Sequence, residues 1–178
     1  MRDAFPQARG RSRLSDTLVI GLGNSWRGDD GAGPAVARAL LDEVQARVRV
    51  YEGEPVGLID DWSGADTVIV VDAVSSGAAP GTIHRLDPLS DPIPAALSQG
   101  STHAFGLAET IELARALDRL PERLTVYGIE GERFAAGDEL SPPVGAAVEA
   151  VREELRGLLG KSAADQRRDP DAGARREA

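Results

Sequence analysis

Three polar residues that are far apart in the sequence each follow an apolar stretch, at positions where a side chain could do chemistry. Asp30 lies in the loop after TLVIGLG, Asp72 ends the run VIVV, and His103 lies in the small-residue loop STHAFG. Two carboxylates and one imidazole form a good ligand set for a divalent metal ion such as nickel or zinc. The same groups could instead act without a metal of their own, as a general acid and a general base.

Each of these residues also has a simpler interpretation. Acids near a helix N-terminus stabilise the helix through its macrodipole, and this would account for Asp29 and Asp30. Asp72 could bond the backbone amides of the following turn, although an unpaired carboxylate against a buried strand is costly to desolvate. His103 stands out only in combination with the two acids. His84 is expected to face solvent and is assigned no role.

The elements that must position these residues alternate between strands and helices. Strands are expected at TLVIGLG, RVRVYEG, TVIVVDAV, GTIHRLDP and LTVYGIE, with helices after Pro34, from Ala104 to Leu120 and after Ser141-Pro142. The alternation predicts an α/β protein with three-layer α/β/α architecture: a mostly parallel twisted sheet of about five strands, with helices on both faces. GTIHRLDP is expected to be a half-exposed strand that pairs as a hairpin with the preceding strand. Because functional groups gather at the carboxyl ends of parallel strands, the three polar residues could converge at one edge.

Length and composition favour one domain, predicted to span residues 16–160 of the 178. The basic segment 1–15 and the tail 161–178 are expected to be disordered, since the tail from Ser162 has no Val, Ile, Leu or aromatic residue. There is no cysteine, which excludes disulfides, thiolate metal sites and a cysteine nucleophile. No apolar run is long enough to cross a bilayer and no signal peptide is recognised, so a cytoplasmic protein is expected.

The charge distribution argues against anionic partners. Residues 1–15 carry four Arg and one Asp, and residues 161–178 carry five basic and four acidic groups. The net charge of the whole chain is −9, so the residues between these ends carry a net charge of −13. A strongly acidic body opposes nucleic acid and anionic membranes, because contacts to phosphate supply most of such affinity. Neither is expected as a partner, whereas a cation fits better.

The glycine-rich stretch GLGNSWRGDDGAGP, from Gly21 to Pro34, is only half of a dinucleotide fingerprint, and its adjacent acids would repel a pyrophosphate. The HExxH, GxSxG and GxxxxGK[ST] motifs are absent. Trp26 projects from this acidic stretch, where an exposed tryptophan could anchor a protein partner or could pack over the helix start.

Taken together, the motifs resemble those of the maturation endopeptidases of nickel-iron hydrogenases. The segment GLGNSWRGDDGAG is similar to the family's GxGNxxxxDDGxG, VIVVDAV carries its Asp after the third strand, and STHAFGL carries its S-x-H-x-x-G-L histidine. YGIEG and LSPPV are similar to the family's last strand exit and helix start. The likeness covers roughly residues 17–158, with the motifs in the same order.

The resemblance implies a peptidase that removes a C-terminal extension from the hydrogenase large-subunit precursor after nickel has been inserted. The metal then belongs to the substrate, and the protein needs no cofactor of its own. The resemblance assigns metal contact and catalysis to Asp30, Asp72 and His103. The residues expected to bind substrate are Asn24, Arg27, Asp29, Glu52 and Gly53.

One segment departs from the family pattern. The family often has D-G-G-T after the second strand, whereas this chain has Tyr51-Glu52-Gly53-Glu54-Pro55, in which Glu52 could replace the usual acid. The segment is implicated in substrate recognition in the family. Two alternatives stay open at this point: a nickel-sensing chaperone that does not cleave, and a peptidase of similar fold with another protein substrate.

Overall fold

The computed structural model describes residues 17–44, 46–98 and 106–165. Their centre is a five-stranded sheet with the strand order β2-β1-β3-β5-β4. Four strands are parallel to one another: β1 (Thr17–Leu22), β2 (Arg47–Tyr51), β3 (Thr67–Val74) and β5 (Arg123–Glu130). The short strand β4 (Ile83–Leu86) runs antiparallel to β5. This arrangement confirms the predicted α/β fold with a mostly parallel five-stranded sheet.

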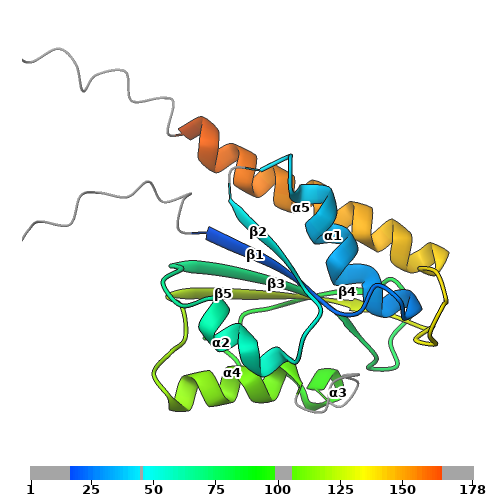
Figure 1. Ribbon diagram of the computed structural model, residues 1–178, viewed down its shortest axis with the longest axis horizontal. Coiled ribbons are helices and arrows are strands. Elements are labelled where there is room, and N and C mark those ends of the chain that lie inside the picture. Colours follow the sequence, from blue (N-terminus) through cyan, green and yellow to red (C-terminus); the bar gives the residue numbers. More distant parts are fainter. Residues whose placement is uncertain (1–16, 45, 99–105, 166–178) are drawn as a thin grey trace, which may run out of the picture.

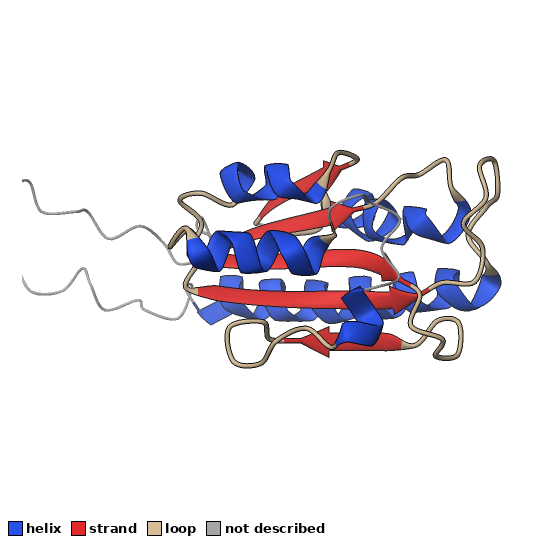
Figure 2. Ribbon diagram, turned by 90° about the horizontal axis from the view of Figure 1, so that it is seen from below, coloured by secondary structure: helices blue, strands red, loops and turns tan. Residues whose placement is uncertain are grey.

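Helices cover both faces of the sheet (Figures 1 and 2). Helices α1 (Ala32–Leu40) and α5 (Pro142–Asp165) lie on one face, and α2 (Leu58–Asp61), α3 (Ala95–Ser98) and α4 (Leu107–Ala116) lie on the other. Two 3-10 turns, η1 (Gly28–Gly31) and η2 (Pro55–Gly57), precede α1 and α2. Among the described residues, no helix has both the length and the apolar character that a membrane span requires.

Alternating side chains of the strands divide the core into two layers, as expected for a sheet that is buried on both faces. In β3, Ile69, Val71 and Ala73 pack with α1 and α5, whereas Val68 and Val70 pack with α2 and α4. Asp72 continues the second series. The sheet therefore delivers this carboxylate to the α4 face, at the carboxyl end of the strand.

Helix α1 lies unusually close to the sheet at its N-terminal end. A Cβ added to Gly33 would come within 2.3 Å of the backbone oxygens of Leu22 and Val71, so only glycine permits this approach. The start of α1 and the loop that precedes it are thereby held against the ends of β1 and β3.

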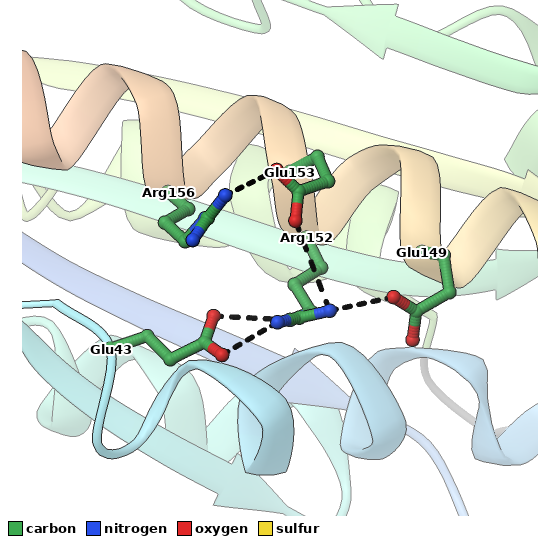
Figure 3. Close-up of polar contacts among 5 residues, drawn as sticks. All are labelled: Glu43, Glu149, Arg152, Glu153 and Arg156. Carbon is green, nitrogen blue, oxygen red and sulfur yellow. Dashed lines mark hydrogen bonds and ion pairs between the residues drawn. The ribbon is translucent and has the colours of Figure 1, made fainter.

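Figure 3 shows an ion-pair network that joins the segment just after α1 to helix α5. Glu43, which follows α1, accepts two hydrogen bonds from Arg152, at 3.0 Å from Nε and 2.6 Å from Nη2. Arg152 also contacts Glu149 and Glu153 on its own helix, and Arg156 pairs with Glu153. The two-pronged contact with Glu43 is the part of the network that fixes one element against another.

One detail differs from the sequence-based expectations. β4 does not form a hairpin with β3, because β1 and β5 occupy both edges of β3, and β4 pairs instead with the free edge of β5. Helix α5 ends at Asp165. The predicted domain bounds of 16–160 and the predicted disorder of segments 1–15 and 161–178 stay predictions, and residues 1–16 and 166–178 lie outside those that the structure describes.

Candidate active site at the carboxyl edge of the sheet

The loop that leaves β1 places Asp30 beside the end of the sheet. At Gly23 the backbone adopts φ +137°, and an added Cβ would lie 2.0 Å from the Asp30 carbonyl oxygen. The Asn24 N–H donates a hydrogen bond to Asp30 Oδ2 at 3.1 Å. Asp30 is thus buried, only 2% exposed, in a loop that is shaped by these contacts of Gly23 and Asn24.

Asp72 lies in the last part of β3 and is 6% exposed. Burial raises the pKa of Asp72 well above its ordinary value, and the negative charge of Asp30 raises it further, against a hydrogen bond from the Ala73 backbone. The two carboxylates are therefore close enough to repel each other in a buried environment. The structure brings together these two of the three residues that the sequence singled out.

The third predicted member, His103, lies outside the described residues. Within the part of the chain that the structure describes, no group of three or more His, Cys, Asp or Glu side chains could hold a metal ion. Asp30 and Asp72 alone supply two oxygen ligands, so a complete metal site here needs further ligands from elsewhere in the chain or from a substrate.

Asp29 differs sharply from its neighbour Asp30. Its side chain is fully buried and accepts hydrogen bonds from the backbone N–H groups of Glu132, Arg133 and Ser141, at 2.6–3.0 Å, and from the Ser141 hydroxyl at 3.0 Å. Burial alone would raise the pKa of Asp29, but these four donors outweigh it and lower the pKa. Asp29 therefore fastens the β1–α1 loop to segment 131–141, and its predicted contact with substrate stays a prediction.

The other residues expected to bind substrate line the same edge. Asn24 Oδ1 accepts a hydrogen bond from the Trp26 N–H, and Arg27 Nε donates to the Phe134 carbonyl at 3.4 Å. Glu52 and Gly53, which follow β2, are largely exposed. The structure therefore leaves Glu52 and Gly53 accessible from solvent, while Asn24 and Arg27 help to shape the loop.

Glu52 is joined to the β1–α1 loop. The Ser25 hydroxyl donates to Glu52 Oε1 at 2.6 Å, and Arg38 of α1 pairs with the same oxygen at 3.2 Å. The Ser25 hydrogen bond is the main reason why the pKa of Glu52 is lowered, and Arg38 adds to it. Sequence reasoning missed Ser25 and Arg38, because their pairing with Glu52 spans three elements.

An apolar recess lies next to Asp72. Its lining comes from the ends of β3, β4 and β5 and from α3 and α4, and comprises Asp72, Ala73, Val74, Leu86, Ile93, Leu97, Leu107, Ala108, Val126 and Gly128. The recess is small, about 30 Å³, and apolar apart from the carboxylate at its wall. It can therefore take only a small apolar group beside Asp72.

His84 was expected to face solvent, and this expectation is wrong. It lies opposite Gly128 on β5 with its side chain 23% exposed, and its Nε2 is 3.5 Å from Glu130 Oε2. Glu130 is almost fully buried and accepts hydrogen bonds from the Ser76 N–H and hydroxyl and from the Gly77 N–H. The placement follows from the pairing of β4 with β5, which turns His84 toward the α4 face.

Comparisons with known proteins agree with this geometry. A family model described as "Hydrogenase maturation protease" matches residues 41–157. The hydrogenase expression/formation protein HoxM of Azotobacter vinelandii is 30% identical over 161 residues, which are 87% of this chain and 78% of that protein. HupD of Thiocapsa roseopersicina, also a hydrogenase expression/formation protein, is 32% identical over 121 residues, 65% of this chain and only 54% of that protein.

The fold is shared with a protein of known structure, the hydrogenase maturating endopeptidase HybD from E. coli. The two chains superpose with a TM-score of 0.64 at 28% identity, over 82% of this chain and 93% of that chain. The family match spans most of the described residues. The chain therefore belongs to the hydrogenase maturation protease family and is an endopeptidase that processes a hydrogenase large-subunit precursor.

Proposed function

We propose that this endopeptidase recognises its precursor through nickel that the precursor carries, with Asp30 and Asp72 as two of the ligands and His103 as a third. The observation that carries the proposal is the pairing of two buried carboxylates at the carboxyl edge of the sheet. Two buried acids that repel each other are stabilised by a cation placed between them. The nickel is part of the substrate, and no cofactor of the protein's own is needed.

The proposed site explains how cleavage waits for the metal. Without the cation, the two acids have no counter-charge from the substrate, and the peptide is not drawn to them. When nickel held by the precursor binds, the C-terminal extension is placed along the apolar recess beside Asp72. Binding energy from the correct substrate then completes the site, which is a physical basis for selectivity.

Hydrolysis adds water across the scissile C–N bond and releases the extension with a new amino terminus. Two routes fit the residues present. The nickel polarises the peptide carbonyl, or a carboxylate of the site takes a proton from the attacking water. The proposal keeps the cytoplasmic location that the sequence suggested.

The test uses purified precursor prepared with and without nickel. Each form is incubated with the protein, and the mass of the large subunit is measured. We expect a shorter large subunit only from nickel-loaded precursor, and no shortening by the Asp72→Asn variant. Asp42→Asn is a matched control, because Asp42 is an exposed acid just after α1, and it should cleave like the wild type.

Equal cleavage of nickel-free and nickel-loaded precursor would refute recognition through the metal. Full activity of Asp72→Asn would remove the assigned site. An intact large subunit in a stable complex with the wild-type protein would favour the chaperone that the sequence left open.

A further inference from the structure

We propose that Trp26 is an anchor through which the protein docks on the folded body of its precursor, beside the place where the C-terminal peptide reaches Asp72. The inference rests on the proposed function, since it takes the hydrogenase large-subunit precursor as the partner. It adds an interaction surface that lies outside the paired acids.

Trp26 is the most exposed of the large apolar side chains in the described residues, with 78% of its surface accessible. The other large exposed side chains are aliphatic and lie on separate elements: Leu41, Val56, Leu117 and Leu158. The second tryptophan of the chain, Trp62, is 1% exposed and its Nε1 donates to the Arg119 carbonyl, as is usual for a buried tryptophan. Tryptophan is the residue type most enriched at the energetic centres of protein interfaces.

The backbone on both sides of Trp26 is fixed. Its N–H donates to Asn24 Oδ1 at 2.9 Å, and its carbonyl accepts a hydrogen bond from the Gly137 N–H at 2.7 Å. The Gly28 N–H donates to the Asp138 carbonyl at 3.2 Å. The next residue is Asp29, whose hydrogen bonds to segment 131–141 are called the Asp29 clasp below. The loop is therefore pre-organised, so that docking through Trp26 loses little backbone entropy.

A hollow of about 450 Å³ lies against Trp26. Its lining comes from the β1–α1 loop, from α1 and from segment 137–140, and comprises Ser25, Trp26, Gly28, Gly31, Ala35, Arg38, Gly137, Asp138, Glu139 and Leu140. The exposed indole and the hollow together offer a ridge and a depression, which is the shape that a folded partner can match.

The charges around the hollow indicate the chemistry of the partner surface. Asp138 and Glu139 are both exposed at its wall, whereas the guanidinium of Arg38 is engaged by Ser25 and Glu52. The charge available to a partner is therefore mainly negative. It fits a patch with an apolar pocket for Trp26 and flanking Lys or Arg residues.

The location argues for the precursor as the occupant. Trp26 is four residues from Asp30 in one loop, so the chain between them spans at most about 14 Å. Docking the folded body raises the effective concentration of the attached C-terminal peptide at the site. A short flexible peptide would otherwise have to bind through the recess beside Asp72 alone.

Binding is tested by fluorine NMR. The protein is prepared with 5-fluorotryptophan, which gives one signal for each of its two tryptophans, and Trp26→Phe assigns them. Addition of unlabelled, nickel-loaded precursor should shift the Trp26 signal and leave the Trp62 signal in place. A Trp26 signal that stays unchanged while the precursor is bound and cleaved would overturn the inference. A signal that shifts with the concentration of the protein alone would overturn it in favour of a second copy as the occupant.

Cleavage kinetics provide the second readout. Trp26→Ala should raise KM by at least about 10-fold, as expected for loss of an interface anchor, with kcat close to that of the wild type. Leu117→Ala is the matched control: it truncates another exposed apolar side chain, at the C-terminal end of α4, and should change neither constant. An unchanged KM in Trp26→Ala refutes the anchor while leaving the nickel site standing, whereas failure of the wild-type protein to cleave refutes the proposed function itself.

Discussion

Asp29 and Asp30 are neighbours of the same residue type, but their side chains make different contacts in the structure. Asp29→Ala would remove the acceptor of four hydrogen bonds from three backbone N–H groups and one hydroxyl, of which the N–H and the hydroxyl of Ser141 are buried. Each buried donor left unsatisfied costs about 1–3 kcal/mol, and the losses are not additive because water can enter the vacated space. We expect the free energy of unfolding to fall by about 4 kcal/mol, which for a domain of this size lowers Tm by roughly 10 °C.

Asp30→Ala is the internal control. It removes the acceptor of the Asn24 N–H but also relieves the repulsion with Asp72, so that the loss of stability should be much smaller than for Asp29→Ala. Thermal unfolding followed by circular dichroism measures stability, and the mass of the processed large subunit measures function. We expect Asp30→Ala to fold and fail to cleave. Equal Tm values for the two variants, or a wild-type Tm for Asp29→Ala, would refute the assignment of Asp29 as a clasp.

The same clasp makes a prediction for acid. The pKa of Asp29 in the folded protein is below its ordinary value of 3.8, so its contribution to stability is complete above that value. The contribution is lost as the pH falls through the folded pKa. The Tm difference between the wild type and Asp29→Ala should therefore be constant near neutral pH and shrink in strongly acidic buffer, which a pH series of unfolding curves would show. A difference that grows with acidification would contradict the sign of the shift.

Three further predictions concern the elements around the site. The pKa of Asp72 is raised in the folded protein, so the contribution of Asp72 to stability is lost as the pH rises from the ordinary pKa of the group through the folded pKa. Asp72→Asn should therefore raise Tm at pH 7, although we expect it to abolish processing. Unfolding curves over a pH series that show a lower Tm for the variant at neutral pH would contradict this. Gly33→Ala should lower the free energy of unfolding by about 3 kcal/mol, because its Cβ would meet backbone oxygens at 2.3 Å. Gly145→Ala adds a Cβ with nothing within 4 Å, and should raise the free energy of unfolding by about 0.5–1 kcal/mol in denaturant titrations, because alanine favours the helix α5. Arg152→Ala should lower Tm more than Arg156→Ala, since of these two residues only Arg152 pairs with Glu43, outside its own helix. The difference in Tm between the two variants should narrow between about 0.1 M and about 1 M salt. Equal Tm values for the two variants would show that the Arg152–Glu43 ion pair contributes nothing to stability.

The strands and the position of Asp72 could be predicted because local sequence determines them. The run TVIVVDAV is typical of a strand buried on both faces, and β3 runs from Thr67 to Val74, so that Asp72 lies near the edge at which the parallel strands end. The partner of β4 could not be predicted in this way. Its pairing depends on which strand edge stays free after β3 has paired on both sides, and that is a property of the whole sheet.

The division between Asp29 and Asp30 was also beyond the sequence. In the sequence both acids precede a helix, and both could stabilise it equally well. What separates them is segment 131–141, whose backbone N–H groups converge on Asp29 from more than 100 residues away, with a sequence separation of 112 for Ser141. No local pattern records such a contact. The Ser141-Pro142 pair predicted the start of α5 correctly, but gave no sign that the Ser141 hydroxyl donates to Asp29.

The clasp also bears on how selectivity can arise. Asp29 joins the β1–α1 loop to segment 131–141, Gly33 holds the start of α1 against β1 and β3, and Glu52 joins the same loop to the end of β2. Among the described residues, the parts that carry Asp30 and Trp26 are therefore fixed by contacts to three different elements. A fixed loop discriminates through the charge and shape that it presents rather than by closing around a ligand. Since the two acids repel each other, a substrate that brings its own cation, as in the proposed function, is the counterpart that such a pre-formed site would favour.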